Sequence, residues 1–193
     1  KSKNIIEELI KDAFHFSDSF LSKLNKTDKL DILKYEFGWV CSYKTKQRSL
    51  NNLHLPNNDK EQLFNDIDNF MKEETKQTYK KLSLTHSRTY LFYGIPGTGK
   101  TSTIRTIATH YNMGIAIIDF NKDMDDKVLQ RAIKKVPNKT ILVIEDIDCL
   151  FINRKNHDDF KNAISFSGIL NCLDGVIQND EVLIFLTTNH IEH

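Results

Sequence analysis

Short apolar runs recur through the second half of the sequence, each bounded by polar or turn-forming residues. They are rich in β-branched and aromatic side chains, which is typical of buried strands. Because they are apolar almost throughout, without polar alternation, both faces of the predicted sheet should be covered. We predict strands at Thr89–Tyr93, Ile115–Phe120, Thr140–Ile144 and Val182–Leu186.

The stretches between these runs carry apolar residues at helical spacing. We predict helices at Thr101–Tyr111, Asp125–Val136 and Ser165–Leu173, with a charged loop at Asn153–Asp159 before the last of them. Strands that alternate with helices indicate an α/β fold, in which a parallel sheet is flanked by helices. Ligands of such sheets bind beyond the carboxyl ends of the strands.

The first third of the chain has a different pattern. Residues 1–34 repeat apolar side chains every three or four positions, which predicts helices, and Tyr35–Tyr43 favours a strand. We interpret the polar stretch Lys44–Asn58 as a linker. Asp59 is placed to cap a helix from Lys60 to about Lys72. Thr75–Arg88 is polar and predicts mostly loop.

These patterns divide the chain into two predicted parts. Residues 1–47 form a mainly helical N-terminal segment followed by a possible strand, in which we find no candidate chemistry. Residues 48–193 form the α/β unit.

Composition limits the classes of function. The chain has 193 residues, 39% of them hydrophobic, so it can bury a core. Its net charge of +1 gives no long-range attraction to nucleic acid or to an anionic membrane. Three scattered cysteines indicate a reducing compartment. No apolar run approaches the ~20 residues of a membrane span. Because the sequence begins with Lys1, we expect a fragment, and a membrane anchor could lie only outside it.

The segment from Gly94 to Ser102 carries the clearest chemistry. It fits the G-x-x-x-x-G-K-[ST] pattern of a phosphate-binding loop and lies between a predicted strand and a predicted helix, as that loop requires. The predicted nucleotide-binding residues are Gly94, Ile95, Pro96, Gly97, Thr98, Gly99, Lys100, Thr101 and Ser102. Lys100 should reach the β- and γ-phosphates, and the Thr101 hydroxyl should bind Mg²⁺.

A pair of carboxylates follows the third predicted strand. In phosphate-loop enzymes one carboxylate holds hydrated Mg²⁺ and a second positions or deprotonates the attacking water. Glu145 and Asp146 are the candidates for these roles, although a surface acidic turn is the alternative interpretation. We expect Asp148 to be structural. Asn189, just past the last strand, could orient the water or contact the γ-phosphate, although asparagine at such a position is more often a turn residue.

The order of these motifs resembles that of AAA ATPases. G-I-P-G-T-G-K-T corresponds to Walker A, I-L-V-I-E-D-I-D to Walker B and T-T-N-H to sensor 1. The Walker B strand ends in Glu-Asp where most members have Asp-Glu. Together with Phe166–Gly175, this order resembles the Bcs-type branch, which includes the mitochondrial chaperone that moves the folded Rieske iron–sulfur protein.

The resemblance implies roles for individual residues. Glu145 would take the Mg²⁺-side position, Asp146 the catalytic carboxylate position and Asn189 the sensor 1 position, with Thr101, Glu145 and Asp146 around Mg²⁺. Asp146 is one methylene shorter than the usual glutamate, so which carboxylate acts as the base stays open. ATP and Mg²⁺ are the implied cofactors, and a homo-oligomeric ring that acts on a protein substrate is the implied assembly.

The resemblance also implies what the chain lacks. Arginine fingers, a last strand and a helical lid follow sensor 1 in the family, so residues 48–193 would be an incomplete large subdomain that binds ATP·Mg²⁺ and hydrolyses it slowly. Phe120–Lys127 lacks an aromatic-apolar-glycine pore loop, which argues against gripping an unfolded chain. The resemblance allows the mitochondrial inner membrane, or a host cytoplasm for a viral protein.

Two other functions are considered. A nucleic-acid motor or loader is disfavoured by the near-neutral charge and the absence of a basic stretch interleaved with aromatic residues. A switch that binds ATP without turnover is disfavoured by the carboxylate pair at Glu145 and Asp146.

Overall fold

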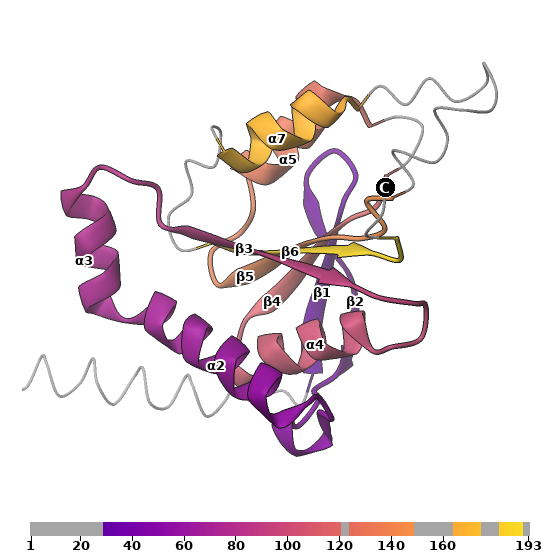
Figure 1. The fold of residues 1–193 in the computed structure, drawn as a ribbon. Helices are drawn as coiled ribbons and strands as arrows, with labels where there is room; N and C mark the ends of the chain where they lie inside the picture. Colours follow the sequence, from indigo (N-terminus) through magenta and orange to yellow (C-terminus); the bar gives the residue numbers. More distant parts are fainter. Residues whose placement is uncertain (1–28, 121–123, 149–163, 175–181, 191–193) are drawn as a thin grey trace, which may run out of the picture.

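A six-stranded sheet forms the centre of the protein (Figure 1). The computed structural model describes residues 29–120, 124–148, 164–174 and 182–190. The strand order across the sheet is β2-β1-β4-β5-β6-β3. The strands are β1 (Lys29–Tyr35), β2 (Trp39–Lys46), β3 (Ser87–Tyr93), β4 (Gly114–Ile118), β5 (Thr140–Ile144) and β6 (Val182–Thr188).

All neighbouring strands run parallel except the β1–β2 hairpin. Parallel pairing aligns the carboxyl ends of β3, β5 and β6 at one edge: Tyr93 pairs with Thr188, and Ile144 pairs with Leu186. Each of these strands therefore delivers the residues that follow it to the same side of the molecule. The predicted α/β class and parallel sheet are confirmed.

Helices cover both faces of the sheet (Figure 1). The helices α2 (Asn57–Met71) and α4 (Lys100–His110) lie on one face, and α5 (Asp126–Lys134) and α7 (Phe166–Asp174) lie on the other. The helix α3 (Glu73–Lys81) follows α2, and a 3₁₀ turn at Leu50–Asn52 precedes α2. Among the described residues, no helix has both the length and the apolar content needed to cross a bilayer.

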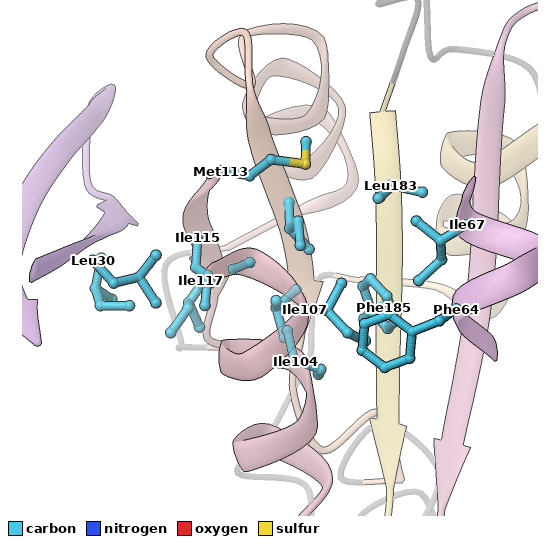
Figure 2. Close-up of a cluster of buried hydrophobic side chains, with 14 of the residues drawn as sticks. Leu30, Phe64, Ile67, Ile104, Ile107, Met113, Ile115, Ile117, Leu183 and Phe185 are labelled. Atoms are coloured by element: carbon cyan, nitrogen blue, oxygen red, sulfur yellow. The ribbon is translucent and has the colours of Figure 1, made fainter. Parts of the chain in front are cut away.

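Two hydrophobic cores follow from the alternation of side chains along the strands. Ile115 and Ile117 of β4 face α2 and α4, whereas Ala116 and Ile118 face α5 and α7. The same alternation places Leu183 and Phe185 of β6 in the core on the side of α2 and α4 (Figure 2). Burial on both faces explains why these strands are apolar throughout.

Three local predictions are wrong. Residues 29–34 were expected to be helical but belong to β1, because pairing with β2 and β4 outweighs a weak helical pattern. Thr75–Arg88 was expected to be mostly loop but contains most of α3 and the start of β3. Asp59 does not cap α2, which begins after Pro56 without a capping side chain, so Asp59 lies within the first turn.

Tyr35–Tyr43 was expected to be one strand but contains the last residue of β1, the turn at residues 36–38 and the first part of β2. The other predicted helices and strands that the structure describes match to within a few residues. The expected boundary after residue 47 lies within one continuous sheet, to which both predicted parts contribute. The strands β1 and β2 come before the boundary, and the other four strands come after it. The predicted helices within residues 1–28 and the charged loop Asn153–Asp159 lie outside the described residues.

A polar cluster ties α2 to β3. Arg88 donates from Nε to Asp66 Oδ2 at 3.0 Å and from a terminal nitrogen to Asp66 Oδ1, and the Tyr90 hydroxyl donates to Oδ2 at 2.7 Å. The hydrogen bonds from Arg88 are the main reason why the pKa of Asp66 is lowered. Burial, with Asp66 adding to it, raises the pKa of Tyr90. The cluster therefore fixes α2 against β3, the strand that leads into the phosphate loop.

A second polar cluster ties α5 to α7. Asp126 accepts from the backbone N–H and from the hydroxyl of Ser165, both at 2.8 Å. The Ser165 hydroxyl oxygen accepts from the Gly168 N–H at 2.8 Å, which caps α7. A Cβ at Gly168 would collide with the Asp126 carboxylate, so this helix position requires glycine.

Gly168→Ala should lower the free energy of unfolding by about 1–3 kcal/mol. The added methyl group would push away the Asp126 carboxylate, which two hydrogen bonds from Ser165 hold in place. Urea unfolding would measure the change. Gly38→Ala is the matched control, since its Cβ would meet nothing within 4 Å. Equal stability of the two variants would contradict the assignment.

Asp66→Asn should destabilise the protein by about 1 kcal/mol at pH 7, a modest value because both partners are more than a third exposed. The folded-state pKa of Asp66 is lowered, so its contribution is present above the ordinary value of 3.8 and is lost as the pH falls through the folded value. Unfolding of both proteins at pH 7 and at stepwise lower pH should therefore show a shrinking difference. A difference independent of pH would exclude this ion pair as its source.

Candidate functional site

The phosphate-loop segment connects β3 to α4 at the edge where β5 and β6 also end. Its turn depends on left-handed backbone conformations at Gly97 (φ +84°) and Gly99 (φ +94°). A side chain would strain both positions, so the glycine spacing of the motif has a direct structural cause. Ile95 is 72% exposed, which leaves the outer side of the loop open.

The first turn of α4 points its backbone N–H groups into this loop. Gly99 precedes the helix and makes no capping side-chain hydrogen bond. The N–H groups of Lys100, Thr101 and Ser102 precede the first intrahelical bond, which runs from Thr103 N to Gly99 O at 2.8 Å. An uncapped helix start with its dipole behind it suits an anion of phosphate size.

Lys100 connects the loop to the end of β6. Its Nζ donates to Gly94 O at 2.6 Å and to Asn189 Oδ1 at 2.9 Å, and lies 3.4 Å from Ile95 O. Two carbonyl oxygens and an amide oxygen therefore hold the Lys100 ammonium group inside the loop. The structure therefore brings together Lys100 and Asn189, which are 89 positions apart in the sequence.

Thr101 meets the first carboxylate of the pair after β5. Its hydroxyl donates to Glu145 Oε1 at 3.0 Å. A hydroxyl and a carboxylate are oxygen ligands of the kind that Mg²⁺ prefers, and this ion commonly takes one or two carboxylates together with phosphate oxygens and water. The pair of Thr101 and Glu145 fits a magnesium ion held jointly with a nucleotide. The side chain of Asp146, the third predicted ligand, contacts Asn189 instead.

Asp146 takes a different direction. Its backbone is left-handed, with φ +51°, which is uncommon for a residue with a side chain. The Thr187 hydroxyl oxygen accepts from Asp146 N at 3.0 Å, and Thr187 O accepts from Ile147 N at 2.9 Å. In this conformation the Asp146 carboxylate is exposed and accepts from Asn189 Nδ2 at 3.2 Å. The two carboxylates therefore serve different partners.

Asp148 lies below the site, at 7% exposure. Its Oδ1 accepts from Asn189 N at 3.2 Å and lies 3.1 Å from the Thr188 hydroxyl. These contacts agree with the expectation that Asp148 pairs with nearby groups.

Thr187 is the first residue of the T-T-N-H motif, but the sequence analysis gave it no role of its own. Lys34 and Asp119 were also missed. Lys34 Nζ pairs with Asp119 Oδ2 at 2.5 Å, and this contact, with a smaller contribution from Glu145, raises the pKa of Lys34. Lys34 lies near the carboxyl ends of the strands because β1 runs parallel to β4. The sequence analysis predicted a helix for residues 29–34 and therefore did not place Lys34 there.

A cavity of 470 Å³ opens beside Lys100. Leu55 and Leu63 line one side, from α2 and the segment before it, and Leu91 and Phe92 of β3 line the other. A larger hollow of 700 Å³ is lined by α3 and by residues 83–86, which precede β3, and by no residue of the phosphate-loop segment. The apolar cavity next to the loop is therefore the one suited to the rest of a nucleotide.

Comparison with known proteins agrees with this geometry. The profile described as "ATPase family associated with various cellular activities (AAA)" matches residues 90–193. A probable mitochondrial chaperone BCS1-A of Dictyostelium discoideum is 38% identical over 75% of this chain and 36% of its own length. A probable mitochondrial chaperone bcs1 of Schizosaccharomyces pombe is 32% identical over the whole chain and 42% of its own length.

Relatives also occur in cattle and plants. The mitochondrial chaperone BCS1 of Bos taurus is 30% identical over 78% of this chain and 37% of its own length. The AAA-ATPase At2g18193 of Arabidopsis thaliana is 35% identical over 80% of this chain and 32% of its own length. The chain spans less than half the length of these relatives. By its profile match, its relatives and its motif order, the chain belongs to the AAA ATPase family, in the Bcs-type branch.

Proposed function

We propose that this chain binds ATP with Mg²⁺ and hydrolyses it, and that hydrolysis drives the remodelling or translocation of a protein by a ring of AAA subunits. The observation that carries the proposal is the connection of three separate motifs: Lys100 to Asn189, Asn189 to Asp146, and Thr101 to Glu145. Each motif alone could serve only the fold, without binding a ligand. Together, at one edge of the sheet, they offer Lys100 to phosphate, Thr101 and Glu145 to the metal, and Asp146 and Asn189 to water.

Phosphate binding belongs to the loop and the start of α4. The backbone N–H groups of the first turn and the Lys100 ammonium group would surround the β- and γ-phosphates. To do so, Lys100 exchanges its bonds to Gly94 O and Asn189 Oδ1 for phosphate oxygens. Release of Asn189 from Lys100 then frees its amide to act at the γ-phosphate. The binding step and the placement of Asn189 are therefore linked through one hydrogen bond.

Metal binding and proton removal are divided between the two carboxylates. Glu145, on the side of the Thr101 hydroxyl, would hold Mg²⁺ with Thr101, partly through water. When bound, Mg²⁺ neutralises charge that develops on the phosphate oxygens. Asp146, exposed and beside Asn189, would position or deprotonate the attacking water. The Asp146 side chain, on a left-handed backbone, contacts Asn189.

The nucleoside would lie in the 470 Å³ cavity beside Lys100. The adjacent α2 is fixed to β3 by the Asp66–Arg88 pair, so the helix side of this cavity is held in place. Protein handling is proposed from the relatives, several of which are named mitochondrial chaperones. The same names support a mitochondrial location, which fractionation of the source cells would test.

Lys100→Ala should weaken ATP binding by about 10- to 100-fold, because the phosphates lose a charged hydrogen-bond donor. Titration calorimetry with ATP and Mg²⁺ would measure the affinity. Lys134→Ala, which removes an exposed lysine from α5, is the control and should bind as the wild type does. Unchanged affinity of Lys100→Ala would refute the phosphate-loop assignment.

Asp146→Asn should reduce kcat of the full-length, assembled protein by about 10²–10⁴-fold and leave ATP affinity within a few-fold, because the amide cannot accept the proton of the water. Asparagine tolerates the left-handed backbone, so the loss should not reflect misfolding.

Glu145→Gln is the companion variant. It should raise the Mg²⁺ concentration needed for activity. If Glu145→Gln instead binds ATP·Mg²⁺ normally and blocks turnover while Asp146→Asn is active, the two roles are reversed. Stimulation of wild-type turnover by DNA, abolished by salt, would favour a nucleic-acid motor over a protein remodeller.

A further inference from the structure

The end of β6 and the turn after β5 are bonded to each other in both directions. Asp146 N and Ile147 N donate to Thr187, and Asn189 N and the Thr188 hydroxyl donate to Asp148. These bonds lie past the last paired residues of the β5–β6 ladder, which ends at Ile144 and Leu186. The two segments that carry the catalytic candidates are therefore joined by hydrogen bonds of their own.

Asn189 depends on this connection for its position. It is the first residue after β6, so the ladder with β3, which ends at Thr188, does not hold its backbone. Its N–H bond to Asp148 Oδ1 supplies that restraint at 3.2 Å. Its side chain meanwhile lies between Lys100 and Asp146. A shift of the Asn189 backbone would move both contacts together.

Asp148 is suited to hold this backbone. It is 7% exposed, so its carboxylate needs protein partners to offset the loss of water. The Thr188 hydroxyl lies 3.1 Å from Asp148 Oδ1 and 3.0 Å from His190 O, and it accepts from His190 N at 3.1 Å. With one proton, the hydroxyl donates to one of these acceptors at a time, and the carboxylate is the stronger acceptor.

We propose that Asp148 is a positioning residue for ATP hydrolysis, which acts through the backbone of Asn189 to hold the Asn189 side chain between Lys100 and Asp146. The hydrogen bonds of Asp148 go to the Asn189 N–H and to the Thr188 hydroxyl. The inference rests on the hydrolytic function proposed above and extends it from the residues that face the nucleotide to the buried group that places one of them.

Three variants in the full-length, assembled protein test the proposal. Asp148→Ala removes the acceptor, and kcat should fall on the order of 10²-fold, the usual cost of a displaced catalytic group. ATP affinity should stay within about threefold, because the phosphate loop and Lys100 are unchanged. Asp148→Asn retains an oxygen that accepts both bonds and should restore kcat to within about fivefold of the wild type.

Thr188→Val covers the case in which Asp148→Ala fails to fold. It removes the hydroxyl and keeps the shape, and kcat should fall by about tenfold, a smaller loss than in Asp148→Ala because the Asn189 N–H bond remains. Thr140→Val is the matched control, since Thr140 is equally buried and its hydroxyl bonds Asn138 O at the opposite end of β5. A loss of kcat as large in Thr140→Val would assign the effect to general destabilisation and overturn the proposal.

A double-mutant cycle separates positioning from simple stabilisation. If Asp148 acts through Asn189, Asp148→Ala should lower kcat in the wild-type background but not in an Asn189→Ala background. Additive losses would overturn the proposal, as would wild-type kcat in Asp148→Ala. A wild-type protein without ATPase activity would instead refute the proposed function, so the two failures are distinguishable.

Discussion

Parallel pairing of β6 with both β3 and β5 is the constraint on which the rest of the structure depends. It places the ends of three strands side by side, and each strand is followed by a different kind of chemistry: a glycine-rich turn with a lysine after β3, two carboxylates after β5, and an amide after β6. A slip of one residue in either ladder would turn every side chain to the other face and separate these groups. The apolar alternation between the two cores prevents such a slip, because Leu183 and Phe185 fit one core and Ile184 and Leu186 fit the other.

The site itself is built against local preference. Asp146 has a left-handed backbone, and Asp148 is a carboxylate at 7% exposure. Each of these features costs stability, and the surrounding sheet must supply it. The helices contribute by fixing its neighbours: the Asp66–Arg88 pair holds α2 against β3, and the Asp126–Ser165 contact holds α7 against α5. Polar clusters at helix contacts thus restrict motion around a site whose own bonds must change when a nucleotide binds.

The success of prediction differed with the range of the interactions involved. Thr140–Ile144 was predicted with its observed bounds because a short apolar run buried on both faces has few alternatives. Gly94–Ser102 was recognisable because phosphate geometry restricts residue type at each position. Residues 29–34 were mispredicted because their strand depends on pairing with β2 and with β4, the latter some 80 positions later. Asp148 was expected to be structural, but its bond to Asn189 could not be deduced, since the sequence specifies the two groups and not the register that joins them.

The pairing of β3 with β6 also has a consequence for the order in which the protein is made. Ser87 pairs with Val182, about 95 residues later, and in the described part of the chain β6 is the sole ladder partner of β3. During synthesis, the phosphate-loop strand leaves the ribosome long before the strand that holds it in the sheet. Closing so long a loop is slow, and the unpaired edge is open to other chains in the meantime. A nascent chain should therefore gain nucleotide affinity abruptly once β6 has emerged, and until then it should be a substrate for chaperones itself.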